Sequence, residues 1–214
     1  HSGNRHSPYF QETFKREGDI ATQDQAYGGF GTLLAERGFI TISTDMDVRT
    51  ESNDHKVFDP ARTLMGERLW GAMRCVDYVS SLPDVDASRI GCAGLSLGGE
   101  IAMWLAAMDV RISACVSCGF LGYMDDFDKY DACPCWKAPG LRELIDFPDL
   151  GSLVAPRPLQ CQMGLQESGS LTPFAARRAM EELRQTYVDL GKPENVSLDI
   201  HIGGHVVDTP SLVW

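Results

Sequence analysis

The sequence lacks long apolar runs, and it is poor in basic residues. No apolar stretch approaches the roughly 20 residues that a membrane-spanning helix requires. Lys and Arg number 19 against 30 Asp and Glu, which gives a formal net charge of -11. Nucleic-acid surfaces and sites for anionic membranes both need clustered Lys and Arg. We therefore expect neither nucleic acid nor a membrane among the partners of this protein.

The sequence also lacks the cysteine spacing of a zinc site. Cys133 and Cys135 form Cys-Pro-Cys, without the two-residue gap of the usual zinc pair, so a structural or lid role is favoured there. We expect neither a metal nor a cofactor. The seven cysteines are an odd number, and most fall inside apolar segments, which favours buried free thiols in a non-oxidising compartment: Cys75, Cys92, Cys115, Cys118 and Cys161.

A signal peptide and an initiating methionine are missing as well. The chain opens on a polar loop at residues 1–7, with no strand before it. We expect from this start a trimmed chain or an excised domain, and we assign no compartment. With 214 residues, 43% of them hydrophobic and 23% charged, residues 1–214 have the size of one globular domain with a substantial core.

The most informative stretch is residues 88–108, SRIGCAGLSLGGEIAMWLAAM. Arg89–Ala93 is a short apolar run typical of a buried strand, and the segment after GLSLGG has a helical apolar pattern. A strand, Gly-x-Ser-x-Gly and a helix in this order predict a nucleophile elbow, in which a tight turn raises the Ser96 hydroxyl above the sheet. Gly94 and Gly98 flank the serine because any Cβ there would crowd the neighbouring strand or helix.

Strands and helices alternate around this elbow. We expect helices over residues 24–37, 59–82 and 172–190, the second with Asp59 as N-cap and Pro60 in its first turn. Strands are predicted at Phe39–Thr44, Ile112–Cys118, Pro156–Met163 and Val196–Ile202. This alternation predicts an α/β fold, a mostly parallel sheet flanked by helices and lacking its first strands.

Residues 119–149 break the alternation. They contain Asp125, Asp126, Asp128 and Asp131, then the Cys-Pro-Cys pair followed by tryptophan, and Pro139-Gly140. An insertion after the strand that follows an elbow commonly covers the active site. We therefore predict a lid or a substrate-binding segment at this position.

A catalytic triad on this type of fold follows the chain order Ser, acid, His. His205 follows the last strand and two glycines and is the predicted base, with His201, inside that strand, as the weaker candidate. Glu167 is the one carboxylate in the loop after the preceding strand, and it is the predicted acid. Asp125 or Asp126 is the alternative acid.

Backbone N–H groups are the expected oxyanion donors. The Leu97 N–H begins the helix after the elbow and is one donor. The second donor of such a site comes from the loop after an early strand, commonly a His-Gly-x loop. His-Ser-Gly opens this chain, so Gly3, or His1 if the loop is one step longer, is the candidate; a solvated terminus is the competing interpretation.

Several further motifs lie outside the elbow. Val85-Asp86 ends a long helix, AMDVRI occupies residues 107–112, CWKAPGL residues 135–141 and APRPL residues 155–159. Together, over about residues 60–205, they resemble the acetyl-xylan-esterase-like and dienelactone-hydrolase-like α/β-hydrolases. The resemblance implies Ser96 as nucleophile, His205 as base and carbohydrate acetyl esters as substrates. The family usually carries Gly-x-x-Asp in the acid loop, where this chain ends the motif with Glu167.

These residues predict a serine hydrolase that cleaves carboxylic esters through an acyl-enzyme. Small-molecule or carbohydrate esters, with acetyl or other short acyl groups, are the expected substrates. Two alternatives stay open: a peptidase or acyltransferase that uses the same triad, and a non-catalytic binding protein on the hydrolase fold.

Overall fold

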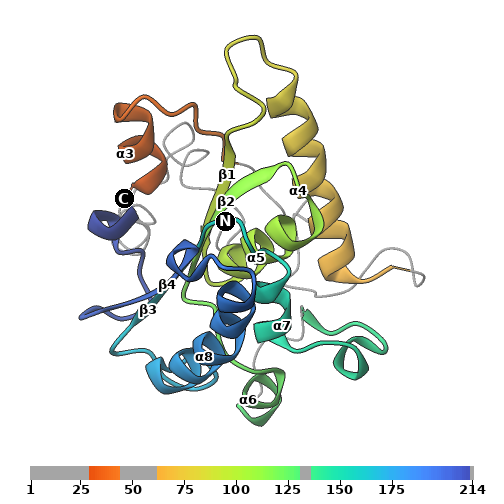
Figure 1. Cartoon of the computed structure of the whole chain (residues 1–214), viewed down its shortest axis with the longest axis vertical. Helices are drawn as coiled ribbons and strands as arrows, with labels where there is room; N and C mark the ends of the chain where they lie inside the picture. The colour runs from red at the N-terminus through yellow and green to blue at the C-terminus, as the bar shows by residue number, and fades with distance from the viewer. Residues whose placement is uncertain (1–28, 44–61, 131–135, 213–214) are drawn as a thin grey trace, which may run out of the picture.

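The computed structural model describes residues 29–43, 62–130 and 136–212. Among these residues the elements are, in chain order, α3 (Phe30–Glu36), α4 (Leu64–Ser80), β1 (Ile90–Leu95), α5 (Leu97–Met108), β2 (Ile112–Cys118), α6 (Met124–Lys129), η2 (Leu141–Glu143), α7 (Phe147–Ser152), β3 (Leu159–Gly164), α8 (Pro173–Asp189), η3 (Pro193–Asn195), β4 (Val196–His201) and η4 (Thr209–Leu212). Figure 1 shows the strands in the middle, with α3 on one side and α4, α5 and α7 on the other.

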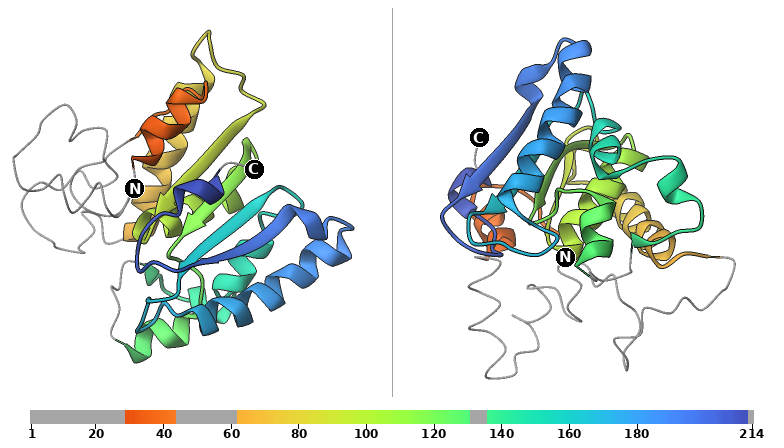
Figure 2. Two further views of the ribbon diagram at one scale, coloured as in Figure 1. Left: turned by 90° about the vertical axis from the view of Figure 1, so that its left-hand side faces the viewer. Right: turned by 90° about the horizontal axis from the view of Figure 1, so that it is seen from below.

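The four described strands form one parallel sheet in the order β1-β2-β3-β4. Parallel neighbours need crossover connections, and α5 and α8 supply two of them. The strand ends are in register, because Leu95 lies opposite Cys118, Cys118 opposite Gln162, and Gly164 opposite His201. The strands run side by side in Figure 2, and the loops that leave their carboxyl ends therefore share one edge of the sheet.

Most of the core lies between the sheet and a row of helices. Within this row α4 contacts α5, α5 contacts α7, and α7 contacts α8. All six residues of β3 are buried, as expected for a central strand covered on both faces. A smaller cluster packs Leu95, Cys118 and Val207 with Phe30 and Leu212. This second cluster joins the ends of β1 and β2 to the carboxyl-terminal segment.

The sequence prediction of a strand at Phe39–Thr44 is wrong for the residues that the structure describes. Residues 39–43 carry no strand, and Phe39, Ile40 and Ile42 are 61%, 54% and 44% exposed. Alternation of β-branched side chains measures how well a segment fits a half-buried sheet, but a strand also needs a neighbouring backbone to pair with. None of the four described strands pairs with this segment.

The predicted start of the long helix is also wrong. The helix begins at Leu64 with Thr63 as N-cap, whose Oγ1 accepts a hydrogen bond from the Gly66 N–H at 3.0 Å, and Asp59 lies outside the described residues. Threonine and aspartate both satisfy the free N–H groups of a first turn, and the structure uses Thr63, which the sequence analysis did not consider. The helix after Thr172 agrees with prediction: Thr172 caps α8, and Gly191, with φ of 68°, follows its end.

The described part of segment 119–149 is built around aromatic side chains. Phe120, Phe127, Trp136 and Phe147 pack edge to face, with ring centroids 4.8–6.4 Å apart, and all four are buried. These contacts anchor α6 and α7 to the main core. Cys133 and Cys135 lie outside the described residues, and the lid role stays a prediction.

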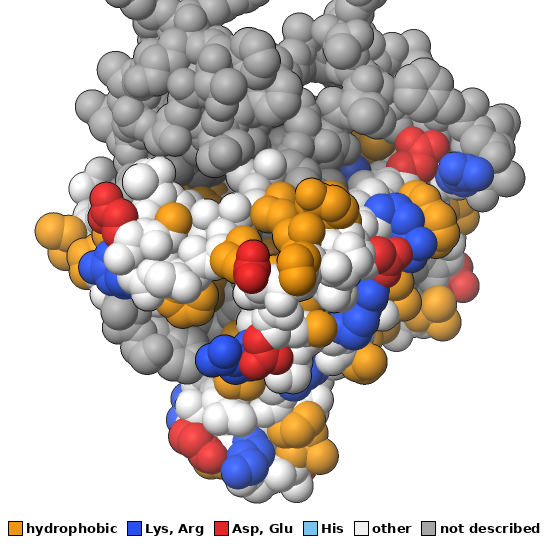
Figure 3. Space-filling model, turned by 90° about the horizontal axis from the view of Figure 1, so that it is seen from above, with side chains coloured by type: hydrophobic (Ala, Val, Ile, Leu, Met, Phe, Trp, Pro, Cys, Tyr) orange, Lys and Arg blue, Asp and Glu red, His pale blue; other side chains and the backbone are white. Residues whose placement is uncertain are grey.

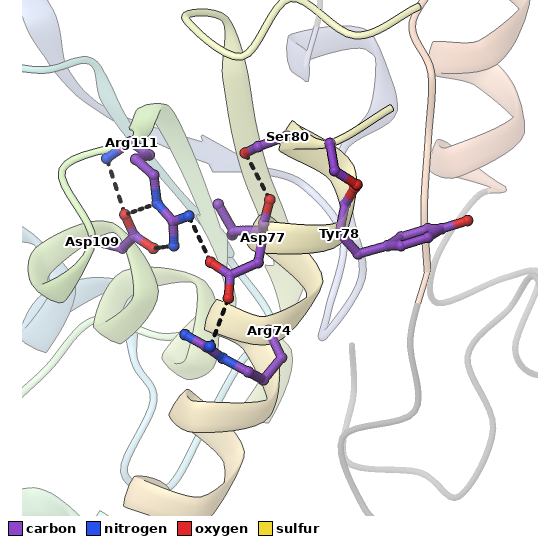
Figure 4. A network of polar contacts seen from close by, with 8 residues as sticks. Arg74, Asp77, Tyr78, Ser80, Asp109 and Arg111 are labelled. Atoms are coloured by element: carbon purple, nitrogen blue, oxygen red, sulfur yellow. Dashed lines mark hydrogen bonds and ion pairs between the residues drawn. The ribbon is translucent and has the colours of Figure 1, made fainter. Parts of the chain in front are cut away.

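A polar network fixes the turn between α5 and β2, at the end of the sheet opposite the elbow (Figure 4). Arg111 donates hydrogen bonds to both carboxylate oxygens of Asp109, through Nε at 2.8 Å and Nη2 at 2.5 Å. Its Nη1 donates to Asp77 of α4 at 2.6 Å, and Asp77 also pairs with Arg74. The hydrogen bonds from Arg111 lower the pKa of Asp109. The network thus ties α4, through Asp77, to Arg111 directly before β2.

The prediction of free thiols is confirmed for the described cysteines, their burial is confirmed for three of the five, and the compartment stays a prediction. Cys75, Cys92, Cys115, Cys118 and Cys161 are free thiols, of which the last three are buried. Over the same residues no helix is both long and apolar enough to cross a membrane. Figure 3 shows one face of the molecule, on which basic and acidic side chains lie next to each other instead of gathering by sign.

Candidate active site

Ser96 occupies a strained turn between β1 and α5. Its φ of 60° and ψ of -124° make it the one non-glycine residue with positive φ in the described part of the chain. Such a conformation costs about 1–3 kcal/mol, and proteins keep it mainly where function requires it. The Ser96 N–H donates to the Cys118 carbonyl at 2.8 Å, and the Ser96 carbonyl accepts from Glu100 N at 2.9 Å. The turn is therefore held by β2 on one side and by its own helix on the other.

Two glycines of GLSLGG, Gly94 and Gly99, are required by close backbone contacts. A Cβ on Gly94 would lie 2.3 Å from the carbonyl carbon and oxygen of Gly98, and one on Gly99 would lie 2.6 Å from the Cys118 carbonyl oxygen. Backbone atoms cannot yield to such overlaps, so a larger residue would open the turn. The predicted sharp turn between a strand and a helix at GLSLGG is confirmed, and the nucleophilic role of Ser96 stays a prediction.

The amino-terminal end of α5 lies directly after Ser96. The helix begins at Leu97, so its N–H belongs to the first turn, where N–H groups have no acceptor within the helix. These groups and the positive end of the helix dipole favour negative charge beside Ser96. Gly3 and His1, the two candidates for a second oxyanion donor, lie outside the described residues.

His205 and Glu167 form a hydrogen-bonded pair. The His205 Nδ1 lies 2.8 Å from Glu167 Oε2, and the second carboxylate oxygen accepts from the Gly164 N–H at 3.1 Å. The Glu167 side chain is 3% exposed and the His205 side chain is 42% exposed. A carboxylate bonded to Nδ1 fixes the imidazole tautomer and leaves Nε2 as the atom that can accept a proton.

The competing acids lie on α6, where Asp125 has another partner, and the competing base His201 has one as well. Asp125 lies on α6 with 83% of its side chain exposed and pairs with Arg142. Asp126 is in the first turn of the same helix. His201 ends β4, and its Nδ1 accepts a hydrogen bond from the Gly203 N–H at 3.2 Å. Of the three carboxylates considered from the sequence, Glu167 is the one that the structure bonds to His205.

Gly119 brings the two halves of the candidate site together. It follows Cys118, whose carbonyl accepts from Ser96 N, and its φ is 58°. A Cβ at Gly119 would lie 2.8 Å from Cε1 and 2.9 Å from Nδ1 of His205. The His205 imidazole therefore packs against Gly119. This residue directly follows Cys118, which is hydrogen-bonded to Ser96. The sequence analysis missed Gly119. Its position directly after the strand that neighbours the elbow strand was the signal that could have identified it.

A buried carboxyl group lies one turn beyond Ser96 in α5. Glu100 and Arg68 of α4 are each 4% exposed. Burial raises the pKa of Glu100 to about 8, while the positive charge of Arg68 opposes this rise. The sequence analysis also missed this pair, because a single glutamate in an apolar helix carries no marker of its burial. Among the residues that the structure describes, no group of three or more His, Cys, Asp or Glu side chains is placed to hold a metal ion.

Comparison with known sequences finds hydrolases and esterases. Residues 73–128 match the family described as BAAT / Acyl-CoA thioester hydrolase C terminal, a range that contains Ser96 but neither Glu167 nor His205. YtaP of Bacillus subtilis is 30% identical over 154 residues, which cover 66% of this chain and 50% of YtaP. Acetyl esterase Axe7A of Xylanibacter ruminicola is 25% identical over 121 residues, which cover 54% of this chain and 28% of the esterase. The chain thus spans half or less of the length of these two relatives.

Comparison with solved structures finds the same architecture. A glucuronoyl esterase from Solibacter usitatus gives a TM-score of 0.61 at 21% identity over 72% of this chain and 50% of the esterase. A glucuronoyl esterase of carbohydrate esterase family 15 from Caldicellulosiruptor kristjansonii gives 0.58 at 18% identity over 69% of this chain and 47% of the esterase. At such identities the likeness establishes the fold. The parallel sheet, the turn between β1 and α5 and these neighbours together show that the described chain has the α/β-hydrolase fold.

Proposed function

We propose that this chain carries the catalytic centre of a serine hydrolase that cleaves carboxylic esters. Ser96 is the nucleophile, His205 the general base and Glu167 the residue that orients the base. The observation that carries the proposal is the His205 Nδ1 to Glu167 Oε2 hydrogen bond of 2.8 Å, formed beside Gly119 and next to the strained Ser96 turn. A strained serine and a carboxylate-bound imidazole at one edge of a sheet are the groups that a hydrolase needs as nucleophile and base.

The reaction proceeds in two acyl-transfer steps. The Ser96 Oγ attacks the ester carbonyl carbon while His205 Nε2 takes the hydroxyl proton. The tetrahedral oxyanion collapses, the carbon–oxygen bond to the alcohol breaks, and the imidazolium gives its proton to the departing alcohol. A water molecule, deprotonated by the same Nε2, then attacks the acyl-enzyme and releases the acid and the free serine. Glu167 stabilises the imidazolium during both steps.

The oxyanion is held by backbone N–H groups. In this proposal the Leu97 N–H at the start of α5 is one donor, and the loop at residues 1–3 supplies the second through Gly3 or His1. One such donor is worth about 3–4 kcal/mol of barrier, because it is aimed at charge that develops only in the transition state. The dipole of α5 acts in the same direction.

The substrate proposal is an ester of a small molecule or a carbohydrate. The solved neighbours are named glucuronoyl esterases, and Axe7A is named an acetyl esterase, which supports a sugar-linked ester. The net charge of -11 favours neutral esters over acidic polymers as substrates and supports the expectation of no nucleic-acid partner. The match to an acyl-CoA thioester hydrolase family adds thioesters as a second class for testing.

The decisive experiment compares Ser96→Ala with a serine control. Ser113→Ala is suitable because the Ser113 Oγ donates to the Ile90 carbonyl at the far end of the sheet. We expect Ser96→Ala to lower kcat for p-nitrophenyl acetate by more than about 10³-fold and to abolish labelling by a fluorophosphonate probe, while Ser113→Ala keeps both. Wild-type turnover in Ser96→Ala would exclude Ser96 as the nucleophile. A folded wild-type chain that neither turns over ester nor reacts with the probe would support the non-catalytic alternative.

The acyl class is tested on one panel. Acetylated sugars, methyl esters of sugar acids, short-chain acyl thioesters and peptides are offered to the wild-type chain under the same conditions. We expect the highest kcat/KM for the sugar-linked esters. A preference for thioesters or peptides would instead support thioester or peptide hydrolysis by the same triad.

A further inference from the structure

We propose that Gln162 is a positioning residue that holds the loop of His205 in its active place. This role rests on the proposed function, because it acts through the base of that reaction. Gln162 lies on β3 and is 1% exposed. It belongs to no motif of the sequence analysis.

The Gln162 side chain binds both backbone groups of one residue in the His205 loop. Its Oε1 accepts from the Asp208 N–H at 2.9 Å, and its Nε2 donates to the Asp208 carbonyl at 3.1 Å. The same Nε2 donates to the Ser211 Oγ at 2.7 Å. Asp208 is three residues beyond His205, so this amide clamp fixes the backbone close to the imidazole. A neutral amide can donate two hydrogen bonds and accept others at the same time, which no aliphatic side chain and no ionised carboxylate does.

Gln162 is also connected to the elbow. Its backbone carbonyl accepts from the Gly119 N–H at 2.8 Å, and Gly119 is the residue on which the imidazole packs. Its Oε1 accepts from the Cys118 Sγ at 3.2 Å. The Cys118 carbonyl in turn accepts from Ser96 N. One residue of the central strand therefore contacts both the end of β2 that supports the Ser96 turn and the loop that carries the base.

The other end of the His205 loop is held by the residues after β3. Leu165 N donates to the His201 carbonyl at 2.8 Å, and Gln166 N donates to the Gly203 carbonyl at 3.1 Å. The Gln166 Nε2 donates to the Ile202 carbonyl at 3.1 Å. The loop is thus fixed before and after His205, and Glu167 in the same β3 loop fixes the ring itself. Without Gln162 the second anchor is lost, and the loop can drift from the Glu167 carboxylate.

Gln160 provides a matched control on the same strand. It precedes Gln162 by two residues, so both side chains lie on one face of β3, and it is 4% exposed. Its Nε2 donates to the Ser211 carbonyl at 3.0 Å, six residues beyond His205. Replacing either glutamine by methionine removes a buried amide of equal size from the same face. Only the Gln162 change removes the clamp on Asp208.

The test measures kcat and KM for p-nitrophenyl acetate together with Tm for wild type, Gln162→Met and Gln160→Met. We expect Gln162→Met to lower kcat by about 10–100-fold with KM within about threefold, because a base displaced by part of an ångström loses its geometry. Gln160→Met is expected to change kcat by less than threefold at a similar loss of Tm. Gln162→Glu, which keeps the acceptor but loses both donors, replaces Gln162→Met if that variant does not fold, and the same loss of kcat is expected.

A double-mutant cycle separates positioning from general destabilisation. In the His205→Ala background Gln162→Met should lower the residual kcat by less than twofold, because the residue it positions is already gone. Equal losses in the two backgrounds, or equal losses for Gln162→Met and Gln160→Met in the wild-type background, would overturn the inference. Undiminished activity in Ser96→Ala would instead overturn the proposed function, so the two failures have different signatures.

Discussion

Replacing Gly119 by alanine adds one methyl group directly against the proposed base. The added Cβ would lie 2.8 Å from His205 Cε1, 2.9 Å from Nδ1 and 3.2 Å from Leu95 Cδ1. Non-bonded carbon atoms prefer about 3.5–4.0 Å, so the ring must move by at least about 0.7 Å. That movement acts on the Nδ1 to Glu167 Oε2 hydrogen bond of 2.8 Å and on the distance from Nε2 to the serine. We expect kcat to fall by about 10–100-fold, since a misplacement near 1 Å costs about 100-fold.

The same substitution also carries a backbone cost that has to be measured separately. Gly119 has φ of 58°, and a residue with a Cβ pays about 1–2 kcal/mol in that region. Gly191 after α8 has φ of 68° and no atom within 4 Å of an added Cβ, so Gly191→Ala pays the backbone cost alone. Both variants should lose about 2–8 °C in Tm. Only Gly119→Ala should lose kcat for p-nitrophenyl acetate.

Two results would refute this reasoning. If Gly119→Ala retains wild-type kcat, the imidazole that packs on Gly119 is not the base. If Gly191→Ala loses as much kcat as Gly119→Ala, the loss follows from destabilisation and carries no information on His205. Assays at a temperature well below both Tm values keep the comparison free of unfolding.

Three further predictions concern the acid, the pH dependence of stability and the turn before β2. Glu167→Gln should lower kcat by about 10²–10⁴-fold while KM changes little, because the amide no longer stabilises the imidazolium; a kcat near wild type would reopen the choice of acid. Burial raises the pKa of Glu100 from 4.5 to about 8, so the folded state holds a proton that the unfolded chain has released, and stability falls as pH rises through this window. Glu100→Gln should flatten that fall, by up to about 1.4 kcal/mol per pH unit, in denaturation curves at pH 5 and pH 8; a slope equal to wild type would show that Glu100 is ionised. Arg111→Met should lower Tm by several degrees at pH 7, because it leaves the Asp109 carboxylate without its main donor. Since those hydrogen bonds lower the pKa of Asp109, their contribution is present above 3.8 and lost as pH falls below it, so the Tm difference should shrink near pH 3; an equal difference at both pH values would contradict the assignment.

Local chemistry made the elbow and the long helices predictable. The turn at Ser96 needs glycines within a few positions of the serine, and such short-range requirements are written in consecutive residues. Thr172 and Gly191 mark the ends of α8 for the same reason, since a cap acts on N–H and carbonyl groups within one turn. The order of Ser96, Glu167 and His205 could be predicted because each follows a strand of one parallel sheet.

Long-range pairing made the rest unpredictable. Residues 39–43 have the side chains of a strand but no paired neighbour in the described sheet, and their alternation carries no information about that partner. The choice of Glu167 over Asp125 became clear only when the loop after β3 and the loop after β4 were seen together. The roles of Gly119 and Gln162 depend on contacts with His205 and Asp208, which are 86 and 46 positions away along the chain.

The sequence by itself therefore determined where a serine turn forms, which segments alternate as strands and helices, and which histidine follows the last strand. Each of these depends on interactions within a single turn, strand or helix. The tertiary structure alone decided which carboxylate bonds to the imidazole and which backbone packs against it. It also decided that residues 39–43 have no strand to pair with in the described sheet. These depend on the register of separate strands, which is set by how the whole core packs and is not encoded in any one segment.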